Sequence, residues 1–174
     1  PIIFNLQSDG SGYNAIIIPH GGIRNFADRN SFDMINYGPG INRNLTQIAL
    51  DGVEVFNFSI REAPANINAT LTLAGIGPEN IDYFILHQAN LLITETIRKK
   101  LKQTPEKFPN SIQEFGNTSS ASVPLTIVTR IADAVRNGKL KLLLCGFGVG
   151  LSWGSVILSL NKTEILPLIE YESA

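Results

Sequence analysis

Hydrophobic residues recur every three or four positions after Asp51, which is the spacing of an amphipathic helix. The repeating positions are Val55, Phe56, Ile60, Ala63, Ile67 and Leu71. Pro64 lies inside this pattern and removes the backbone hydrogen bond to the carbonyl of Ile60. We therefore expect either a kinked helix or two abutting helices in this part of the chain.

Two further helices are predicted in the second half of the chain. Asn90 can N-cap the first of them, which then runs from Leu91 to about Lys102. The second follows the small, polar residues 116–122 and stops at Gly138, because glycine is typical of helix C-termini. Its apolar positions are Leu125, Val128, Ile131, Ala132 and Val135.

Short continuous apolar runs indicate buried strands. They cover residues 13–19 (around Ile16, Ile17 and Ile18), 82–86, 140–145 and 155–160. The last two runs are joined through the glycine-rich residues 146–150. The resulting order of strand, helix, strand, helix, helix, strand, strand predicts an α/β fold, with a mixed sheet covered by helices on both faces. At this length we expect a single domain over residues 1–174.

Composition and charge narrow the class of function. A net charge of −1 gives no reason to expect a nucleic-acid partner, which usually needs a clustered basic face. Two histidines and one cysteine, widely scattered, predict no metal site. No apolar run approaches the roughly 18 residues of a membrane span. Together with the single cysteine, this favours a cytoplasmic protein. Because the sequence begins at Pro1 rather than at a methionine, we expect a segment upstream of it.

Two polar segments lie where this kind of fold places its chemistry. His87 directly follows the strand 82–86, and ligands of open α/β sheets collect at the carboxyl ends of strands. Residues 116–122 place small polar side chains before a helix, whose N-terminus presents NH groups without intrahelical partners. N-capping by one Ser or Thr would account for only one residue of that segment.

The glycine-rich residues 146–154 match two catalytic motifs imperfectly. Leu151 stands where the dinucleotide motif Gly-x-Gly-x-x-Gly needs a glycine. Ser152 fits the Gly-x-Ser-x-Gly motif of serine hydrolases, but that motif needs a helix after the serine, and strand-like residues follow here. A serine hydrolase therefore stays only as a minor alternative. Cys145 is flanked by leucines and is interpreted as a core thiol rather than a nucleophile.

Five segments in this order resemble the type III β-ketoacyl-acyl-carrier-protein synthases, which are condensing enzymes with the thiolase fold. These segments are Ser8-Asp9-Gly10, residues 51–56, His87-Gln88-Ala89-Asn90, residues 116–124, and the glycine-rich stretch ending at Trp153-Gly154. The resemblance covers nearly the whole chain and corresponds to the C-terminal one of the two similar halves of that family. It implies that the N-terminal half, with the nucleophilic cysteine and most of the dimer interface, is absent from this chain.

The resemblance also implies a reaction and a set of site residues. The reaction is a decarboxylative Claisen condensation of malonyl-acyl-carrier protein with an acyl thioester in fatty acid biosynthesis. His87 and Asn117 match the catalytic pair that stabilises the enolate, and the backbone NH of Val149 matches a donor of the oxyanion hole. The positions that match the lining of the pantetheine tunnel are Gly52, Phe56, Ala89 and Asn90. No metal or other cofactor is implied, since thioesters of CoA and of the carrier protein are the substrates.

The implied partners are the N-terminal half of the same enzyme, acyl-carrier protein, acyl-CoA and a second copy in a homodimer. Leu92 stands where better-known members carry an arginine, so docking of the acidic carrier is in doubt or falls to the basic residues Arg98, Lys99 and Lys102. The chain alone is expected to be inactive and to expose a large apolar face. A related condensing enzyme of secondary metabolism and a non-catalytic thiolase-like partner module remain as alternatives.

Overall fold

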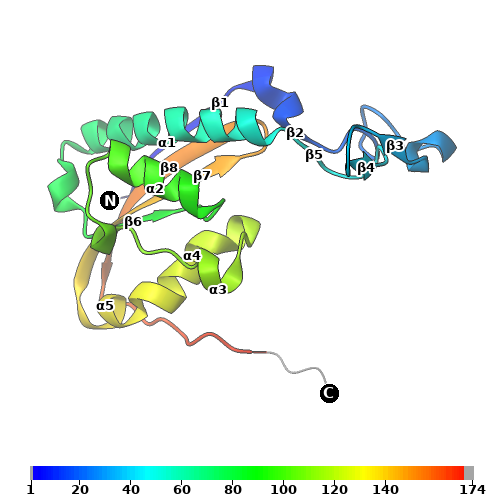
Figure 1. The fold of residues 1–174 in the computed structure, drawn as a ribbon. Helices are drawn as coiled ribbons and strands as arrows, with labels where there is room; N and C mark the ends of the chain where they lie inside the picture. Colours follow the sequence, from blue (N-terminus) through cyan, green and yellow to red (C-terminus); the bar gives the residue numbers. More distant parts are fainter. Residues whose placement is uncertain (1, 171–174) are drawn as a thin grey trace.

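A four-stranded mixed sheet forms the centre of the molecule in the computed structural model, which describes residues 2–170 (Figure 1). The strands lie in the order β1 (Ile3–Ser8), β8 (Ser152–Asn161), β7 (Lys139–Gly148) and β6 (Tyr83–Leu86). β6 and β7 are parallel, whereas β7 with β8 and β8 with β1 are antiparallel. The predicted mixed sheet is therefore confirmed. The edge strand β1 was not predicted.

Helices cover both faces of this sheet, as expected. Alternate residues of a strand point to opposite faces, and both sets are apolar in β6 and β7. Phe84 and Leu143 belong to a core shared with the long helix α1 (Gly52–Ala74) and with α2 (Leu91–Lys100). Ile85 and Leu142 belong to a second core on the opposite face, which is covered by the segment 122–137. The two strands are therefore buried from both sides.

The segment 122–137 is one helical stretch with an irregularity in its middle. It consists of α4 (Ser122–Thr126), the π-helical turn η6 (Ile127–Ile131) and α5 (Ala132–Asn137). Val135 is buried against the sheet and Gly138 ends the helix, as predicted. At the start of the π turn, Ile127 packs on the sheet where the sequence pattern favoured Val128. The extra residue of a π turn shifts the helix face, and this shift explains the difference.

The remaining short elements connect these layers. They are η1 (Gly10–Ala15), η2 (Arg29–Phe32), η3 (Pro78–Asn80), η4 (Pro105–Lys107), α3 (Ile112–Phe115) and η5 (Ser119–Ala121). Of these, η5 directly precedes α4 and carries residues that later line the cavity.

Residues 16–50 form an arm that projects from the body (Figure 1). Two short antiparallel ladders hold it together: β2 (Ile16–Ile17) with β5 (Ala49–Leu50), and β3 (Ile35–Asn36) with β4 (Asn42–Arg43). Of the buried strand predicted at residues 13–19 only β2 forms, and the predicted burial is wrong, because Ile16 and Ile17 are only half-buried and Ile18 is 56% exposed. The isoleucines belong to an apolar surface rather than to a core.

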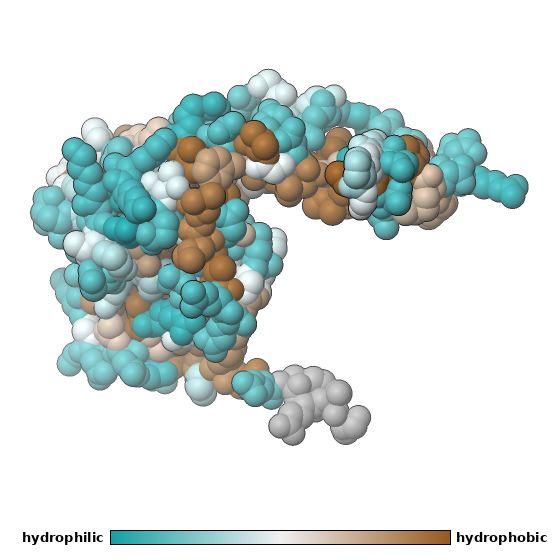
Figure 2. Space-filling view, in the orientation of Figure 1, coloured by the Kyte–Doolittle hydropathy of each residue, from teal (hydrophilic) through white to brown (hydrophobic). Residues whose placement is uncertain are grey.

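This arm exposes many large hydrophobic side chains. Ile23 is 90% exposed and Phe26 is 76% exposed. Figure 2 shows hydrophobic residues gathered along the arm and in a band over the body. Burying a side chain of this size is worth about 1.5–3 kcal/mol. The arm leaves that stabilisation unused within the part of the chain that the structure describes.

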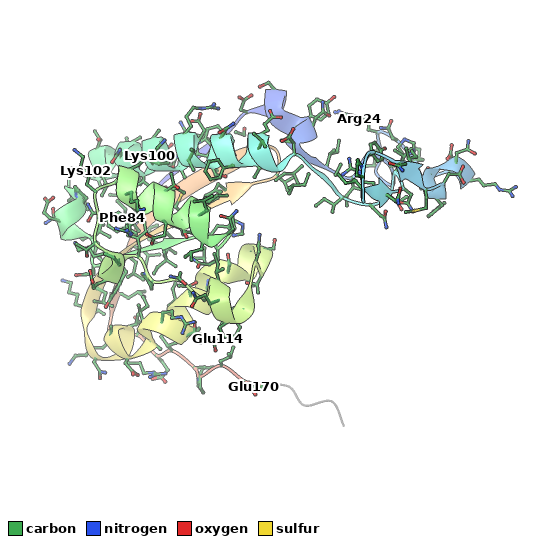
Figure 3. The ribbon with its side chains drawn as sticks, viewed as in Figure 1. Arg24, Phe84, Lys100, Lys102, Glu114 and Glu170 are labelled. Carbon is green, nitrogen blue, oxygen red and sulfur yellow. The ribbon has the colours of Figure 1, made fainter. Side chains whose placement is uncertain are left out.

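The helix α1 runs through Pro64 as a single helix, which excludes two abutting helices. Its first turn is capped by Asp51, whose carboxylate accepts hydrogen bonds from the NH groups of Val53 and Glu54 at 3.0 and 2.9 Å. Pro64 has no NH to offer the carbonyl of Ile60. Lys100 of α2, which is labelled in Figure 3, donates to that carbonyl from Nζ at 2.9 Å. The neighbouring helix therefore supplies the hydrogen bond that the proline removes.

We predict that Lys100→Met lowers the free energy of unfolding by about 1 kcal/mol, because the Ile60 carbonyl loses its donor. Urea denaturation measures the change, and Lys99→Met on the same exposed helix end is the control. In a Pro64→Ala background residue 64 regains its NH, so Lys100→Met should cost clearly less there. Equal costs in the two backgrounds would contradict the compensating role of Lys100.

Candidate active site

His87 lies at the carboxyl ends of the two parallel strands. It follows β6 directly, and its backbone NH donates to the carbonyl of Cys145 in β7 at 2.8 Å. The half-buried ring makes an edge-on contact with Phe147, with 5.4 Å between the ring centroids. The strand pairing therefore fixes where the imidazole stands, at the edge of the sheet where α/β folds bind ligands.

The ring of His87 is anchored through one of its nitrogens. Nδ1 lies 2.8 Å from Oγ of Ser122, the first residue of α4. Burial lowers the pKa of His87 below the ordinary histidine value, and the carbonyl of Ser119 opposes this effect. Desolvation disfavours the charged imidazolium, so the ring is neutral at pH 7.

Asn117 is placed by a tight turn that precedes it. Gly116 adopts a φ of 65° there, a conformation that favours glycine. The side-chain oxygen of Asn117 accepts a hydrogen bond from the NH of Ser119 at 2.9 Å. Its Nδ2 reaches the carbonyl of Ala89 only at 3.4 Å, which is long for a hydrogen bond. The amide is therefore oriented by its oxygen and keeps N–H groups for a ligand.

His87, Asn117 and Val149 line one cavity of about 700 Å³. Val149 stands at the tip of the β7–β8 hairpin and is 65% exposed. The other lining residues are Ile16, Ile48 and Leu50 of the arm, Ser119, Ser120, Ser122 and Val123 at the start of α4, and Gly146, Phe147 and Gly148 of β7. The cavity thus combines an apolar wall with a few polar groups, which is typical of ligand sites.

The four residues predicted for a substrate tunnel lie outside the lining of this cavity. Phe56 and Ala89 pack at the margin of the core under α1. The side chain of Asn90 caps α2 by accepting a hydrogen bond from the NH of Ile93 at 2.8 Å, as predicted. Gly52 is the first residue of α1. Gly52 and Phe56 thus belong to the start of α1, and Ala89 and Asn90 directly precede α2.

Two groups of site residues were not found from the sequence. The arm contributes Ile16, Ile48 and Leu50 to the cavity wall, although nothing in their local pattern links them to His87. Ser122 is the other omission. It belongs to the small, polar segment 116–122, but its pairing with a ring 35 residues earlier is visible only in the fold.

The other nucleophile candidates do not join this site. Cys145 is 1% exposed, it lies in the core on the α1 side of the sheet, and burial raises the pKa of its thiol to about 11. Ser152 opens β8 and is followed by strand, so the strand–turn–helix geometry of a nucleophile elbow is not formed.

Among residues 2–170 no group of three His, Cys, Asp or Glu side chains could hold a metal ion. No helix in the same range is long and apolar enough to cross a bilayer.

The comparisons with known sequences agree on one family. Residues 71–160 match the model of the family described as 3-oxoacyl-[acyl-carrier-protein] synthase III C terminal. A β-ketoacyl-[acyl-carrier-protein] synthase III of Lactococcus lactis subsp. lactis is 35% identical over 157 residues, which are 89% of this chain and 45% of that protein. One from Halalkalibacterium halodurans is 40% identical over 119 residues, covering 68% of this chain and 38% of the relative.

The solved structures agree with these sequences. A crystal structure of a 3-oxoacyl-(acyl-carrier-protein) synthase III superposes with a TM-score of 0.85 at 35% identity, covering 92% of this chain and 47% of that one. A 3-oxoacyl-(acyl-carrier-protein) synthase of Burkholderia xenovorans gives 0.83 at 35% identity, covering 97% and 46%. The predicted fold class is therefore confirmed. The chain spans about half the length of the relatives that it matches.

The burial of Cys145 predicts a thiol that resists alkylation. With a pKa of about 11, only about one thiol in a thousand is ionised at pH 8. We expect iodoacetamide to label the native chain very slowly and the urea-unfolded chain at the rate of an ordinary cysteine, as measured by mass spectrometry. Cys145→Ser, which has no thiol, is the control for labelling at other residues. Fast labelling of the native chain would show a reactive thiol and contradict the assignment to the core.

The lowered pKa of His87 predicts that acid destabilises the fold. The unfolded chain takes up a proton near the ordinary histidine pKa of about 6.5, whereas the folded chain resists it, so this contribution is complete above that pH and is lost below it. Urea denaturation at about pH 7.5 and pH 5.5 should show a smaller fall for His87→Asn than for the unchanged chain. His20→Asn is the control, and an identical fall in all three proteins would contradict the prediction.

Proposed function

This chain belongs to the family of 3-oxoacyl-[acyl-carrier-protein] synthase III C-terminal domains, and we propose that it is the enolate-stabilising half of a condensing enzyme. The proposed reaction joins malonyl-acyl-carrier protein to an acyl thioester by decarboxylative Claisen condensation, in fatty acid biosynthesis in the cytoplasm. The observation that carries this proposal is that His87 and Asn117 face one cavity. A partner module without catalysis would have no use for such a pair.

In the proposed reaction the acyl group is held as a thioester on a cysteine outside this chain. The malonyl carboxylate leaves as carbon dioxide, and the electron pair of the broken C–C bond forms an enolate on the remaining thioester. The enolate carbon then attacks the acyl carbonyl. A new C–C bond forms, the C–S bond to the cysteine breaks, and the cysteine leaves as a thiolate. The negative charge that develops on the thioester oxygen is the charge that this half of the enzyme must stabilise.

Asn117 and His87 are proposed as the groups that meet this charge, and the backbone NH of Val149 is proposed as a donor to the oxyanion of the acyl-enzyme. The Asn117 amide can donate at once, because its oxygen is already engaged by Ser119 and only one of its two N–H groups is directed at a protein acceptor, the Ala89 carbonyl. His87 can donate only from a ring nitrogen that carries a proton and faces the oxygen. Each well-placed donor lowers the activation barrier by on the order of 3 kcal/mol. At Val149 the backbone NH would do the work, so its side chain does not affect the donor.

The nucleophile is proposed to come from an N-terminal half that packs on this one, as a domain of the same enzyme. The buried thiol of Cys145 cannot take this role. The exposed hydrophobic residues of the arm, such as Ile23 and Phe26, support a large missing contact surface. We further propose that the complete protein is a homodimer and takes its acyl group from acyl-CoA.

The end of α2 is the proposed docking site for the acidic carrier protein. Arg98 is held by Glu95 and by the carbonyl of Gln103, and Lys100 is held by the carbonyl of Ile60. Lys99 and Lys102 are exposed at the same helix end. Leu92, which replaces the arginine of better-known members, is 66% exposed and adds no charge. Lys99 and Lys102 therefore carry the proposed electrostatic attraction to the carrier.

A chimera provides the test of the proposed function. The N-terminal half of the Lactococcus lactis relative is fused to this chain, and condensation of acetyl-CoA with malonyl-acyl-carrier protein is followed by mass spectrometry of the carrier. We expect activity from the chimera and none from the chain alone. Asn117→Ala and His87→Ala should each lower kcat by about 10²–10³-fold, because each removes a group that stabilises the transition state.

The control for these variants is Gln113→Ala, an exposed change in α3 outside the cavity. It should leave kcat within about twofold of the unchanged chimera. Condensation by the isolated chain, or full activity of both site variants in the chimera, would overturn the proposed function.

A further inference from the structure

The hydroxyl of Ser122 stands at the meeting point of three hydrogen bonds behind the His87 ring. Its Oγ lies 2.7 Å from the carbonyl oxygen of Ser119, 2.8 Å from Nδ1 of His87 and 3.2 Å from the backbone nitrogen of Gln88. Ser122 is fully buried, so water does not compete for these contacts. A buried hydroxyl must satisfy its proton and its lone pairs among these three neighbours.

The direction of each hydrogen bond follows from what each neighbour can do. A hydroxyl has one proton to donate and two lone pairs that accept. The Ser119 carbonyl can only accept and the Gln88 NH can only donate. The proton therefore goes to Ser119, and one lone pair is taken by Gln88. The remaining lone pair faces His87, so Nδ1 of the ring must be the donor.

The opposite assignment leaves two oxygen atoms in contact without a proton between them. If Ser122 donated to His87, its Oγ would face the Ser119 carbonyl oxygen at 2.7 Å with no hydrogen bond to hold them there. That distance is the usual one for an O–H···O hydrogen bond. It therefore supports donation from Ser122 to Ser119.

Other buried side chains hold Ser122 in this position. Thr126 Oγ1 donates to the backbone carbonyl of Ser122 at 2.8 Å, and Ser111 Oγ lies 2.8 Å from Thr126 Oγ1. Since the Thr126 proton is already used, Ser111 is the donor to Thr126. The NH of Ser111 in turn donates to the side-chain oxygen of Gln88 at 3.1 Å. The directions of these hydrogen bonds are mutually consistent and return to the residue next to His87.

We infer that Ser122 is a positioning residue that fixes neutral His87 in the Nδ1–H tautomer, so that Nε2 presents a lone pair to the cavity. The hydrogen bond between the ring and a side chain is made by Nδ1, and the ring itself lines the cavity. The tautomer follows from the hydrogen bonds alone and does not depend on the reaction.

The consequence for chemistry rests on the proposed function. In the resting site the Asn117 amide is a donor, whereas His87 is an acceptor at Nε2. His87 can donate to a developing oxyanion only as the imidazolium, after Nε2 has taken up a proton. The two residues therefore differ in the resting site: Asn117 is a donor as it stands, whereas His87 is a donor at Nε2 only while its ring is protonated there.

Nitrogen-15 NMR of the histidine-labelled chain tests the inference directly. Long-range correlations between the ring protons and the ring nitrogens identify the protonated nitrogen. The chain has only two histidines, so His20→Gln assigns the His87 signals. At about pH 8 we expect the Nδ1–H tautomer to exceed the Nε2–H tautomer about tenfold, which corresponds to one net hydrogen bond. A predominant Nε2–H ring in the unchanged chain would overturn the inference.

Two serine variants separate the role of the hydroxyl from general effects on the loop. Ser122→Ala removes the acceptor of Nδ1–H, so the tenfold excess should be lost. Ser120→Ala, an exposed serine of the same loop, should leave the tautomer unchanged. If Ser122→Ala fails to fold, which its amide spectrum shows, the unchanged chain still decides the question. A chimera without activity but with the expected tautomer would overturn the proposed function and leave this inference standing.

Discussion

The parallel pairing of β6 with β7 is the constraint on which the rest of the structure depends. Both strands are buried on both faces, so their side chains anchor the core under α1 on one side and the core under α4 and α5 on the other. The pairing continues for one hydrogen bond past β6, from the NH of His87 to Cys145. The backbone of His87 therefore cannot shift without breaking the ladder that organises both cores. A rigid sheet end is the kind of support that a preorganised site needs.

The elements that were predicted correctly have strong local signals. β6, β7 and β8 each contain a largely apolar stretch of strand length, and α2 starts where Asn90 offers a capping side chain. Local patterning failed where the environment depends on distant residues. The edge strand β1 pairs with β8 from the other end of the chain, and its side chains Phe4 and Leu6 stay largely exposed. An apolar sequence pattern indicates that side chains favour burial, but it does not tell which surface buries them. In the arm the apolar residues do not form a core.

Only part of the site could be predicted, because some of its residues have local sequence signals and others are brought in from distant parts of the chain. The strand end at His87 and the small, polar segment around Asn117 are visible in the sequence, and the resemblance of their surroundings to a known family assigned roles to them. The wall that the arm provides and the hydrogen bond between Ser122 and His87 are products of folding. A serine in a loop has several possible partners, and only packing selects one. The ring nitrogen that carries the proton is therefore a property of the tertiary structure rather than of the motif.

Pro64 illustrates a different relation between sequence and fold. A proline inside a helix is a local defect, and here a cation from another helix repairs it. Because of this hydrogen bond, α1 and α2 should be transferred together in protein engineering. If α1 alone were grafted into another protein, the carbonyl of Ile60 would have no hydrogen-bond donor unless the host supplied one. The hydrogen bond also favours one alignment of the two helices, since within the helix interior Pro64 frees only the carbonyl of Ile60. Pro64, which would weaken an isolated helix, thus helps to set the position of α2 along α1.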